Sequence, residues 1–179
     1  MFRLDNKVAI VTGAARGIGR AIATALSYQG AQVAVVDILF DEVAAVATVI
    51  GGSERAYEAD LTSVDAIRKL VDSVVADFGT IDVLVNNAGI VRDRMFANAT
   101  EEEWDAVMRV HVKGHFAVSR HAVAHWCERS KAGEEVEARI INTSSGAGLQ
   151  GSVAQSCYSA AKAAIAGLTL VQEAELGRY

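Results

Sequence analysis

Short runs of β-branched residues alternate along this chain with longer stretches that have the periodicity of amphipathic helices. Strands connected through helices pair in parallel, and right-handed crossovers place the helices on both faces of the sheet. The sequence therefore predicts an α/β fold with three layers, built on a doubly wound parallel sheet in one domain over residues 1–179. The predicted strands, each followed by a predicted helix, are residues 7–12, 32–37, 55–59, 81–85 and 138–143.

The stretch after the third predicted strand shows the pattern of a helix with one buried face. Its apolar side chains recur at the i, i+3, i+4 spacing and are Ile67, Leu70, Val71, Val74, Val75 and Phe78. Two threonines precede acidic residues by three positions, Thr62 before Asp65 and Thr100 before Glu103. This spacing has the form of a capping box and predicts that helices begin at these threonines.

Composition limits the classes of partner that this chain can bind. With 51% apolar and 22% charged residues in 179, the chain can bury one sizeable core. A net charge of −5 argues against nucleic acids and anionic membrane surfaces as partners, since both require clustered Lys and Arg. The apolar runs are shorter than the roughly 18 residues of a membrane span, and predicted structure begins near residue 7, so we expect a cytoplasmic protein.

A glycine-rich segment, TGAARGIG at residues 12–19, follows the first predicted strand and leads into a helix. Glycines at this point allow a sharp turn and let the backbone approach a pyrophosphate. Free N–H groups and the positive end of the helix dipole favour the negative charge of that group. Three glycines alone also fit an ordinary turn with positive φ.

Asp37, at the end of the second predicted strand, narrows this interpretation. It lies about twenty residues beyond the glycines, where a carboxylate accepts hydrogen bonds from the adenosine ribose hydroxyls. The same carboxylate repels a 2′-phosphate, so the sequence favours NAD over NADP. Arg16 is the counter-argument, because a basic residue in this loop can hold a 2′-phosphate.

Further motifs follow the fourth and fifth predicted strands. They are NNAG at residues 86–89, Ser145, and Tyr158 followed four residues later by Lys162. Together with the loop at 12–19, these motifs resemble those of the short-chain dehydrogenase/reductases, and the resemblance covers the whole chain. It implies a Rossmann fold and an NAD-dependent oxidoreductase that moves a hydride between nicotinamide and a secondary alcohol or ketone.

The chemistry explains the spacing of Tyr158 and Lys162. They are one helical turn apart on one face, so the ammonium can stabilise the tyrosinate. That tyrosinate takes the proton of the alcohol while hydride leaves for the nicotinamide, and the neutral phenol donates a proton in the reverse direction. By resemblance, Ser145 hydrogen-bonds the substrate oxygen. The alternatives are that Ser145 is a helix cap and that its neighbour Ser144 takes the role.

The resemblance also assigns cofactor contacts. It places the pyrophosphate against the glycine loop, the adenine beside the residues after the third strand, the nicotinamide ribose beside the tyrosine and lysine, and the cofactor wall after the fourth strand. The cofactor-binding residues expected on this basis are Gly13, Arg16, Gly17, Ile18, Gly19, Asp37, Asp60, Leu61, Asn87, Ala88, Gly89, Tyr158 and Lys162.

His111 departs from the family pattern. Many relatives have an asparagine at this place in the long helix after the fourth strand, where it supports a water-linked proton path to the lysine. A histidine donates, accepts and titrates near neutral pH, so we expect an altered relay in which His111 takes part in catalysis.

All four histidines, at positions 111, 115, 121 and 125, fall in this helix on an arc of about 120°. A metal site is not predicted, because no carboxylate accompanies the His-x-x-x-His pairs as in a zinc hydrolase. By resemblance the helix packs against a partner subunit, which implies a homodimer or homotetramer. We therefore hypothesise that the histidine arc weakens dimerisation below neutral pH.

The end of the chain is the second departure. Relatives continue past Tyr179 into a sixth strand, a substrate-covering helical loop and a seventh strand. We expect a chain truncated at its C-terminus relative to the family, with the fifth strand left as a sheet edge and one wall of the substrate pocket removed.

The segments at residues 87–96 and 154–162, with His111, look most like relatives that act on 3-oxoacyl or 3-hydroxyacyl thioesters. An NAD-linked hydroxyacyl dehydrogenase is therefore the favoured interpretation. Two alternatives stay open: a family member acting on a steroid, sugar or polyol, and a cofactor-binding fragment or sensor without turnover.

Overall fold

The computed structural model describes residues 3–51 and 55–179, and within these ranges five parallel strands form one sheet in the order β3-β2-β1-β4-β5. Each predicted strand is present, with bounds within two residues of those expected. The order reverses beside β1, so the carboxyl ends of β1 and β4 flank the crevice where sheets of this type bind ligands. The strands are β1 (Val8–Thr12), β2 (Gln32–Asp37), β3 (Arg55–Glu58), β4 (Val83–Asn86) and β5 (Arg139–Asn142).

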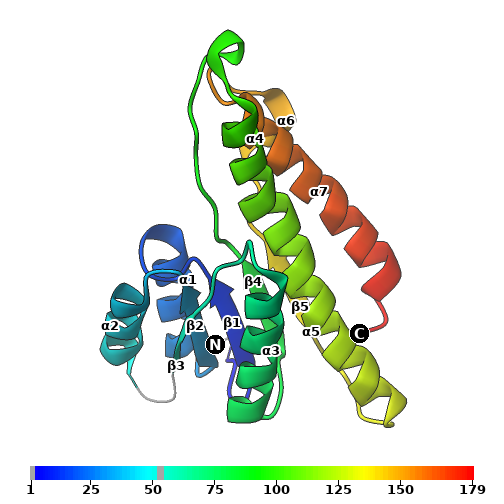
Figure 1. Cartoon of the computed structure of the whole chain (residues 1–179). Coiled ribbons are helices and arrows are strands. Elements are labelled where there is room, and N and C mark those ends of the chain that lie inside the picture. Colours follow the sequence, from blue (N-terminus) through cyan, green and yellow to red (C-terminus); the bar gives the residue numbers. More distant parts are fainter. Residues whose placement is uncertain (1–2, 52–54) are drawn as a thin grey trace.

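Helices cover both faces of the sheet, with α1 and α2 on one side and α3 and α5 on the other (Figure 1). The predicted long helix after β4 consists of α4, η2 and α5, which follow one another without a break and run beside α7 (Figure 1). The helical segments are α1 (Gly17–Tyr28), α2 (Phe40–Ile50), α3 (Val64–Phe78), the 3₁₀ turn η1 (Phe96–Asn98), α4 (Glu101–Met108), the π-helical η2 (Arg109–Lys113), α5 (Gly114–Lys131), α6 (Gly146–Gln150) and α7 (Ser156–Leu176).

Strand β1 shows how the two faces are filled. Val8 and Ile10 pack with α3 and α5, whereas the alternate residues Ala9 and Val11 pack with α1 and α2. Burial on both faces is what a β-branched run without polar alternation predicts. Each fully buried Val or Ile contributes about 1.5–3 kcal/mol, so this central strand anchors the site at its carboxyl end.

One of the two predicted helix starts is wrong by one residue. Thr100 and Glu103 form the expected capping box at α4, but α3 is capped by Ser63, whose Oγ accepts a hydrogen bond from the Ala66 N–H at 3.3 Å. The Asp60 carboxylate accepts the Thr62 N–H at 2.8 Å and holds that residue in a turn. The helix therefore begins after this turn, because an Asx turn competes with helical backbone bonding.

In the part of the chain that the structure describes, none of the helices has the length and apolar character needed to cross a membrane. Strand β5 lies at one edge of the sheet, as expected, with Arg139 exposed and Ile141 49% exposed.

Candidate active site

The glycine-rich loop after β1 is packed closely against the start of α1. A Cβ atom on Gly19 would lie 2.1 Å from the backbone oxygen of Gly13, so the start of α1 can approach the loop only with glycine at this position. Gly17 has φ +57°, which favours glycine, and the space where its Cβ would point is open. The loop therefore presents bare backbone to the crevice.

Thr12, at the end of β1, holds this loop to the loop after β4. Its buried Oγ1 donates to the Val85 oxygen at 3.2 Å and accepts the Asn87 N–H at 2.9 Å. The side-chain amide of Asn87 in turn donates a hydrogen bond to the Thr12 backbone oxygen at 3.0 Å. Asn87, a predicted cofactor residue, thus has its side chain committed to joining the two loops. Thr12 was not among the residues predicted from the sequence, although its position at a strand end was a signal.

A cavity of about 360 Å³ lies at the carboxyl edge of the sheet and brings together several predicted cofactor residues. Those that line it are Gly13, Asp37, Asp60, Leu61, Ala88 and Gly89. Other lining residues were missed, although most adjoin a predicted site residue in the sequence: Val36, Ile38, Ala59, Thr62, Ile90 and Val110.

Asp37, which lines this cavity, and Arg16 in the glycine-rich loop are held by different partners. The Asp37 carboxylate accepts the N–H groups of Ala15 at 3.1 Å and Leu39 at 3.2 Å, which fixes its orientation. The Arg16 guanidinium lies 3.2 Å from the Glu42 carboxylate on α2 and is mostly exposed. Such an exposed pair stabilises the fold little, but Glu42 offsets the positive charge that Arg16 brings to the loop.

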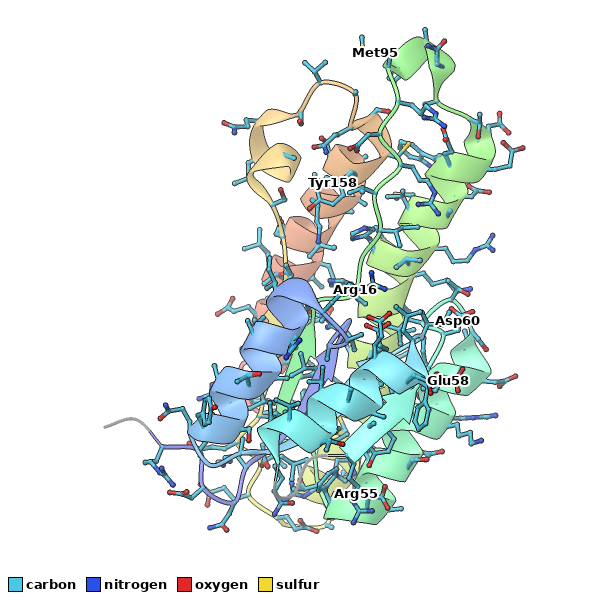
Figure 2. All side chains as sticks on the ribbon, turned by 90° about the vertical axis from the view of Figure 1, so that its left-hand side faces the viewer. Arg16, Arg55, Glu58, Asp60, Met95 and Tyr158 are labelled. Carbon is cyan, nitrogen blue, oxygen red and sulfur yellow. The ribbon has the colours of Figure 1, made fainter. Side chains whose placement is uncertain are left out.

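These residues fit a dinucleotide. Arg16 precedes α1, and within the described residues no side chain caps this helix, so the first N–H groups, which include those of Ile18 and Gly19, are available to an anion. The open space at Gly17 admits a pyrophosphate, and Asp37 offers acceptors for ribose hydroxyls. Figure 2 shows Arg16 and Asp60 below Tyr158 in this view.

The predicted Tyr158 and Lys162 lie on α7, with the Lys162 Nζ 5.6 Å from the centre of the Tyr158 ring. Lys162 is buried, and its ammonium donates a hydrogen bond to the Thr143 backbone oxygen at 2.5 Å. Burial lowers the pKa of Lys162 to about 8. The His111 and Tyr158 rings form a T-shaped pair, with their centroids 5.5 Å apart and their planes at 84°.

The two serines after β5 have different contacts. Ser145 is the N-cap of α6, and its Oγ accepts the Ala147 N–H at 3.2 Å, so the predicted alternative of a helix cap is observed. Its hydroxyl proton is free to point elsewhere, because this bond uses only a lone pair. Ser144 instead donates to the Lys162 backbone oxygen at 3.0 Å and ties the loop to α7.

The four histidines do not form one accessible stripe on the long helix, while an effect of histidine on dimerisation stays a prediction. His111 and His115 are buried inside the subunit, with exposed fractions of 2% and 1%, and His121 and His125 line a groove against α3. Helical periodicity identifies residues that share an arc but does not say which arc meets the sheet.

Burial lowers the pKa of His111, so its imidazole is neutral at pH 7. Among the residues described, no cluster suited to a metal ion occurs.

The sequence model described as short chain dehydrogenase matches residues 7–179. The chain belongs to the short-chain dehydrogenase family. Membership of this family implies a nicotinamide cofactor, in agreement with the loop, the cavity and the pair on α7. The resemblance that the sequence motifs indicated is therefore confirmed, as is the fold that it implied.

Relatives within the family include enzymes named for hydroxyacyl and oxoacyl chemistry. Hydroxyacyl-CoA dehydrogenase ChsB1 of Mycobacterium tuberculosis is 46% identical, over 98% of this chain and 58% of the relative. 3-Oxoacyl-[acyl-carrier-protein] reductase FabG of Thermotoga maritima is 38% identical, over 97% of this chain and 70% of the relative. (3R)-3-Hydroxyacyl-CoA dehydrogenase of Canis lupus familiaris is 37% identical, over 99% of this chain and 71% of the relative.

A crystal structure of a short chain dehydrogenase from Mycobacterium avium superposes with a TM-score of 0.96 at 54% identity. It is matched over 100% of this chain and 67% of its own length. The chain thus spans about three fifths to seven tenths of the length of these family members.

Proposed function

We propose that this protein is an NAD-dependent oxidoreductase that interconverts a secondary alcohol and a ketone. The observation that carries the proposal is the position of Tyr158 and the buried Lys162 on α7, at the carboxyl edge of the sheet that also holds the dinucleotide cavity. The pair on α7 offers proton transfer.

Each residue has a distinct role in this reaction. The bound nicotinamide supplies the hydride acceptor when the alcohol is oxidised and the donor when the ketone is reduced. Tyr158 takes the hydroxyl proton as the carbinol C–H bond breaks, and returns it in the reverse direction. The Lys162 ammonium, held by Thr143, stabilises the tyrosinate, and the Ser145 hydroxyl donates a hydrogen bond to the substrate oxygen.

NAD is the proposed cofactor, with NADP disfavoured. A 2′-phosphate would approach the Asp37 carboxylate, whose orientation is fixed by the Ala15 and Leu39 N–H groups. Arg16 is the cation available in the glycine-rich loop to offset that repulsion, and Glu42 already pairs with it at 3.2 Å. Both observations lower the affinity expected for a 2′-phosphorylated cofactor.

A 3-hydroxyacyl or 3-oxoacyl thioester is the proposed substrate, as the names of the relatives indicate. The loop before α4 meets the loop before α7, where the Arg94 N–H donates to the Ala154 oxygen at 2.8 Å. Phe96 and Val153 on these loops are each 83% exposed. Figure 2 places Met95 above Tyr158, so apolar side chains are available to an acyl chain beyond the reacting carbon.

Fluorescence titration with NADH, combined with NAD reduction by 3-hydroxyacyl-CoA, a steroid, a sugar and a polyol, tests the proposal. We expect NADH binding, and turnover that is fastest with the thioester. Tyr158→Phe should bind NADH as the unchanged chain does and lose turnover at least about 10²-fold, since it removes only the proton-transferring group. Binding without reduction of NAD would identify a sensor, and tighter binding of NADPH would overturn the choice of cofactor.

We also propose that the protein is a homo-oligomer. Light scattering, which measures the mass of the protein in solution, tests this proposal.

A further inference from the structure

His111 reaches the cofactor cavity through an irregularity in the long helix. It lies in η2, a π-helical turn of five residues inserted between α4 and α5. A π-helical turn inside an α-helix shifts the helical register, and such turns occur often at functional sites. Here the insertion coincides with a fully enclosed imidazole that lies against the loop after β4.

The imidazole contacts the backbone of Ile90 through a single ring atom. The His111 Nε2 lies 3.0 Å from the Ile90 nitrogen and 2.7 Å from the Ile90 oxygen. A neutral imidazole nitrogen either accepts a hydrogen bond or donates one, so it can pair with only one of these two groups at a time. The other ring nitrogen, Nδ1, is buried without a partner among the described residues.

The loop after β4 packs closely against this ring, with no room for a side chain at Gly89. A Cβ atom on Gly89 would lie 2.4 Å from the His111 Cε1. Gly89 and Ile90 both line the dinucleotide cavity, and the same imidazole lies nearly perpendicular to the Tyr158 ring. His111 therefore touches the cavity wall on one side and the proton-transferring residue on the other.

We propose that His111 is a positioning residue that sets the Gly89–Ile90 wall of the cofactor cavity, pairing with the Ile90 N–H or the Ile90 oxygen according to the tautomer of its ring. The inference rests on the proposed function in one respect, that NAD occupies this cavity. Each tautomer leaves one backbone group of Ile90 unpaired, so the wall is held by one bond where two partners are present. An amide side chain of similar length has both a donor and an acceptor. It could therefore hold the Gly89–Ile90 wall by two hydrogen bonds, one to the Ile90 N–H and one to the Ile90 oxygen.

Three variants of the full chain test this arrangement. His111→Gln places an amide nitrogen and oxygen near the position of Nε2, His111→Leu removes both, and His121→Asn changes a histidine on the same helix away from the cavity. Hydrogen exchange of the Ile90 amide should be slowest in His111→Gln, intermediate in the unchanged chain and at least about tenfold faster in His111→Leu. Nitrogen-detected NMR of the imidazole identifies its tautomer.

Cofactor binding supplies the second measurement. His111→Leu should raise the Kd for NADH and the KM for NAD by about tenfold, the effect of leaving a buried backbone group unpaired, with kcat changed much less. His111→Gln and His121→Asn should stay within about threefold of the unchanged chain. Equal exchange rates at Ile90 in all four proteins, or a loss in His111→Gln as large as in His111→Leu, would overturn the inference. Absence of NADH binding by the unchanged chain would instead count against the proposed function, because the exchange measurement needs no cofactor.

Discussion

The Lys162 ammonium donates a hydrogen bond to the backbone oxygen of Thr143, 2.5 Å away, while it lies 5.6 Å from the centre of the Tyr158 ring. The lysine is thus held by the loop after β5, one helical turn beyond the tyrosine it supports. The buried cation has a partner in a carbonyl rather than in a carboxylate, and burial lowers its pKa to about 8. Several consequences of this arrangement and its surroundings can be measured.

Replacing the lysine should separate stability from activity. Because the charged form of Lys162 is disfavoured in the folded state, Lys162→Met should raise the free energy of unfolding at pH 7 by about 1 kcal/mol and abolish turnover. Between the folded-state pKa of about 8 and the unfolded value near 10.5, the unfolded chain binds more protons at this site, so the native protein gains stability as pH rises. The advantage of the variant should therefore shrink toward pH 10 in urea titrations. A variant less stable than the unchanged chain at pH 7 would contradict this reasoning.

Gly148 on α6 is a second support of the lysine. A Cβ atom there would lie 2.6 Å from the Lys162 carbonyl carbon and 2.6 Å from the Ala163 nitrogen, both backbone atoms of α7. Gly148→Ala should therefore displace α6, lower stability by about 1–3 kcal/mol and reduce kcat. Gly167→Ala is the matched control, because Gly167 also lies in a helix, α7, and a Cβ atom added there would meet no other atom within 4 Å. This variant should stabilise the chain by about 0.5–1 kcal/mol. Equal melting shifts for the two variants would refute the close-packing argument.

His115 should make stability depend on pH below neutrality. Burial lowers the pKa of His115 from its ordinary value of 6.5 to about 3, and the nearby charges of Lys162 and His111 lower it in the same direction. Between these values the unfolded chain binds a proton at this position that the folded chain does not, so stability is lost as pH falls from about 6.5 toward 3. The slope reaches about 1.4 kcal/mol per pH unit for one proton. Urea titrations from pH 4 to 8 should show a smaller slope in His115→Leu, and identical slopes would exclude His115 as the source.

Cofactor choice should respond to the charges around Arg16. Asp37→Ala with Glu42→Ala removes the carboxylate that would face a 2′-phosphate and releases Arg16 to bind one. We expect the double variant to bind NADPH at least about tenfold more tightly than the unchanged chain does, with Asp37→Ala alone intermediate. An unchanged ratio of NADH to NADPH affinities in both variants would show that these residues do not decide the choice.

Much of the site could be predicted because its residues are tied to elements that the sequence specifies locally. Strand ends, the glycine spacing at 12–19 and the helical spacing of Tyr158 and Lys162 all follow from backbone geometry, so their positions agree with expectation. The first residue of α3 does not agree with expectation. The Asp60 carboxylate accepts a hydrogen bond from the Thr62 N–H, so the helix begins later in the sequence than Thr62 predicted.

Contacts between distant segments could not be predicted in this way. The pairing of Arg16 with Glu42 spans 26 residues, and the contact of His111 with Ile90 spans 21. Each depends on how α2 or η2 packs against a loop, and the same periodicity is compatible with an exposed or a buried histidine arc.

The sequence by itself determined the doubly wound sheet, the family and the carboxyl edge at which the proposed chemistry lies, since these follow from local periodicity and from motifs of fixed spacing. Only the tertiary structure decided that Asn87 joins two loops, that Ser145 caps α6, and that His111 is a buried contact of the cavity wall. The physical reason is that hydrogen-bond partners and burial are set by the packing of elements far apart in the chain, which no local pattern encodes.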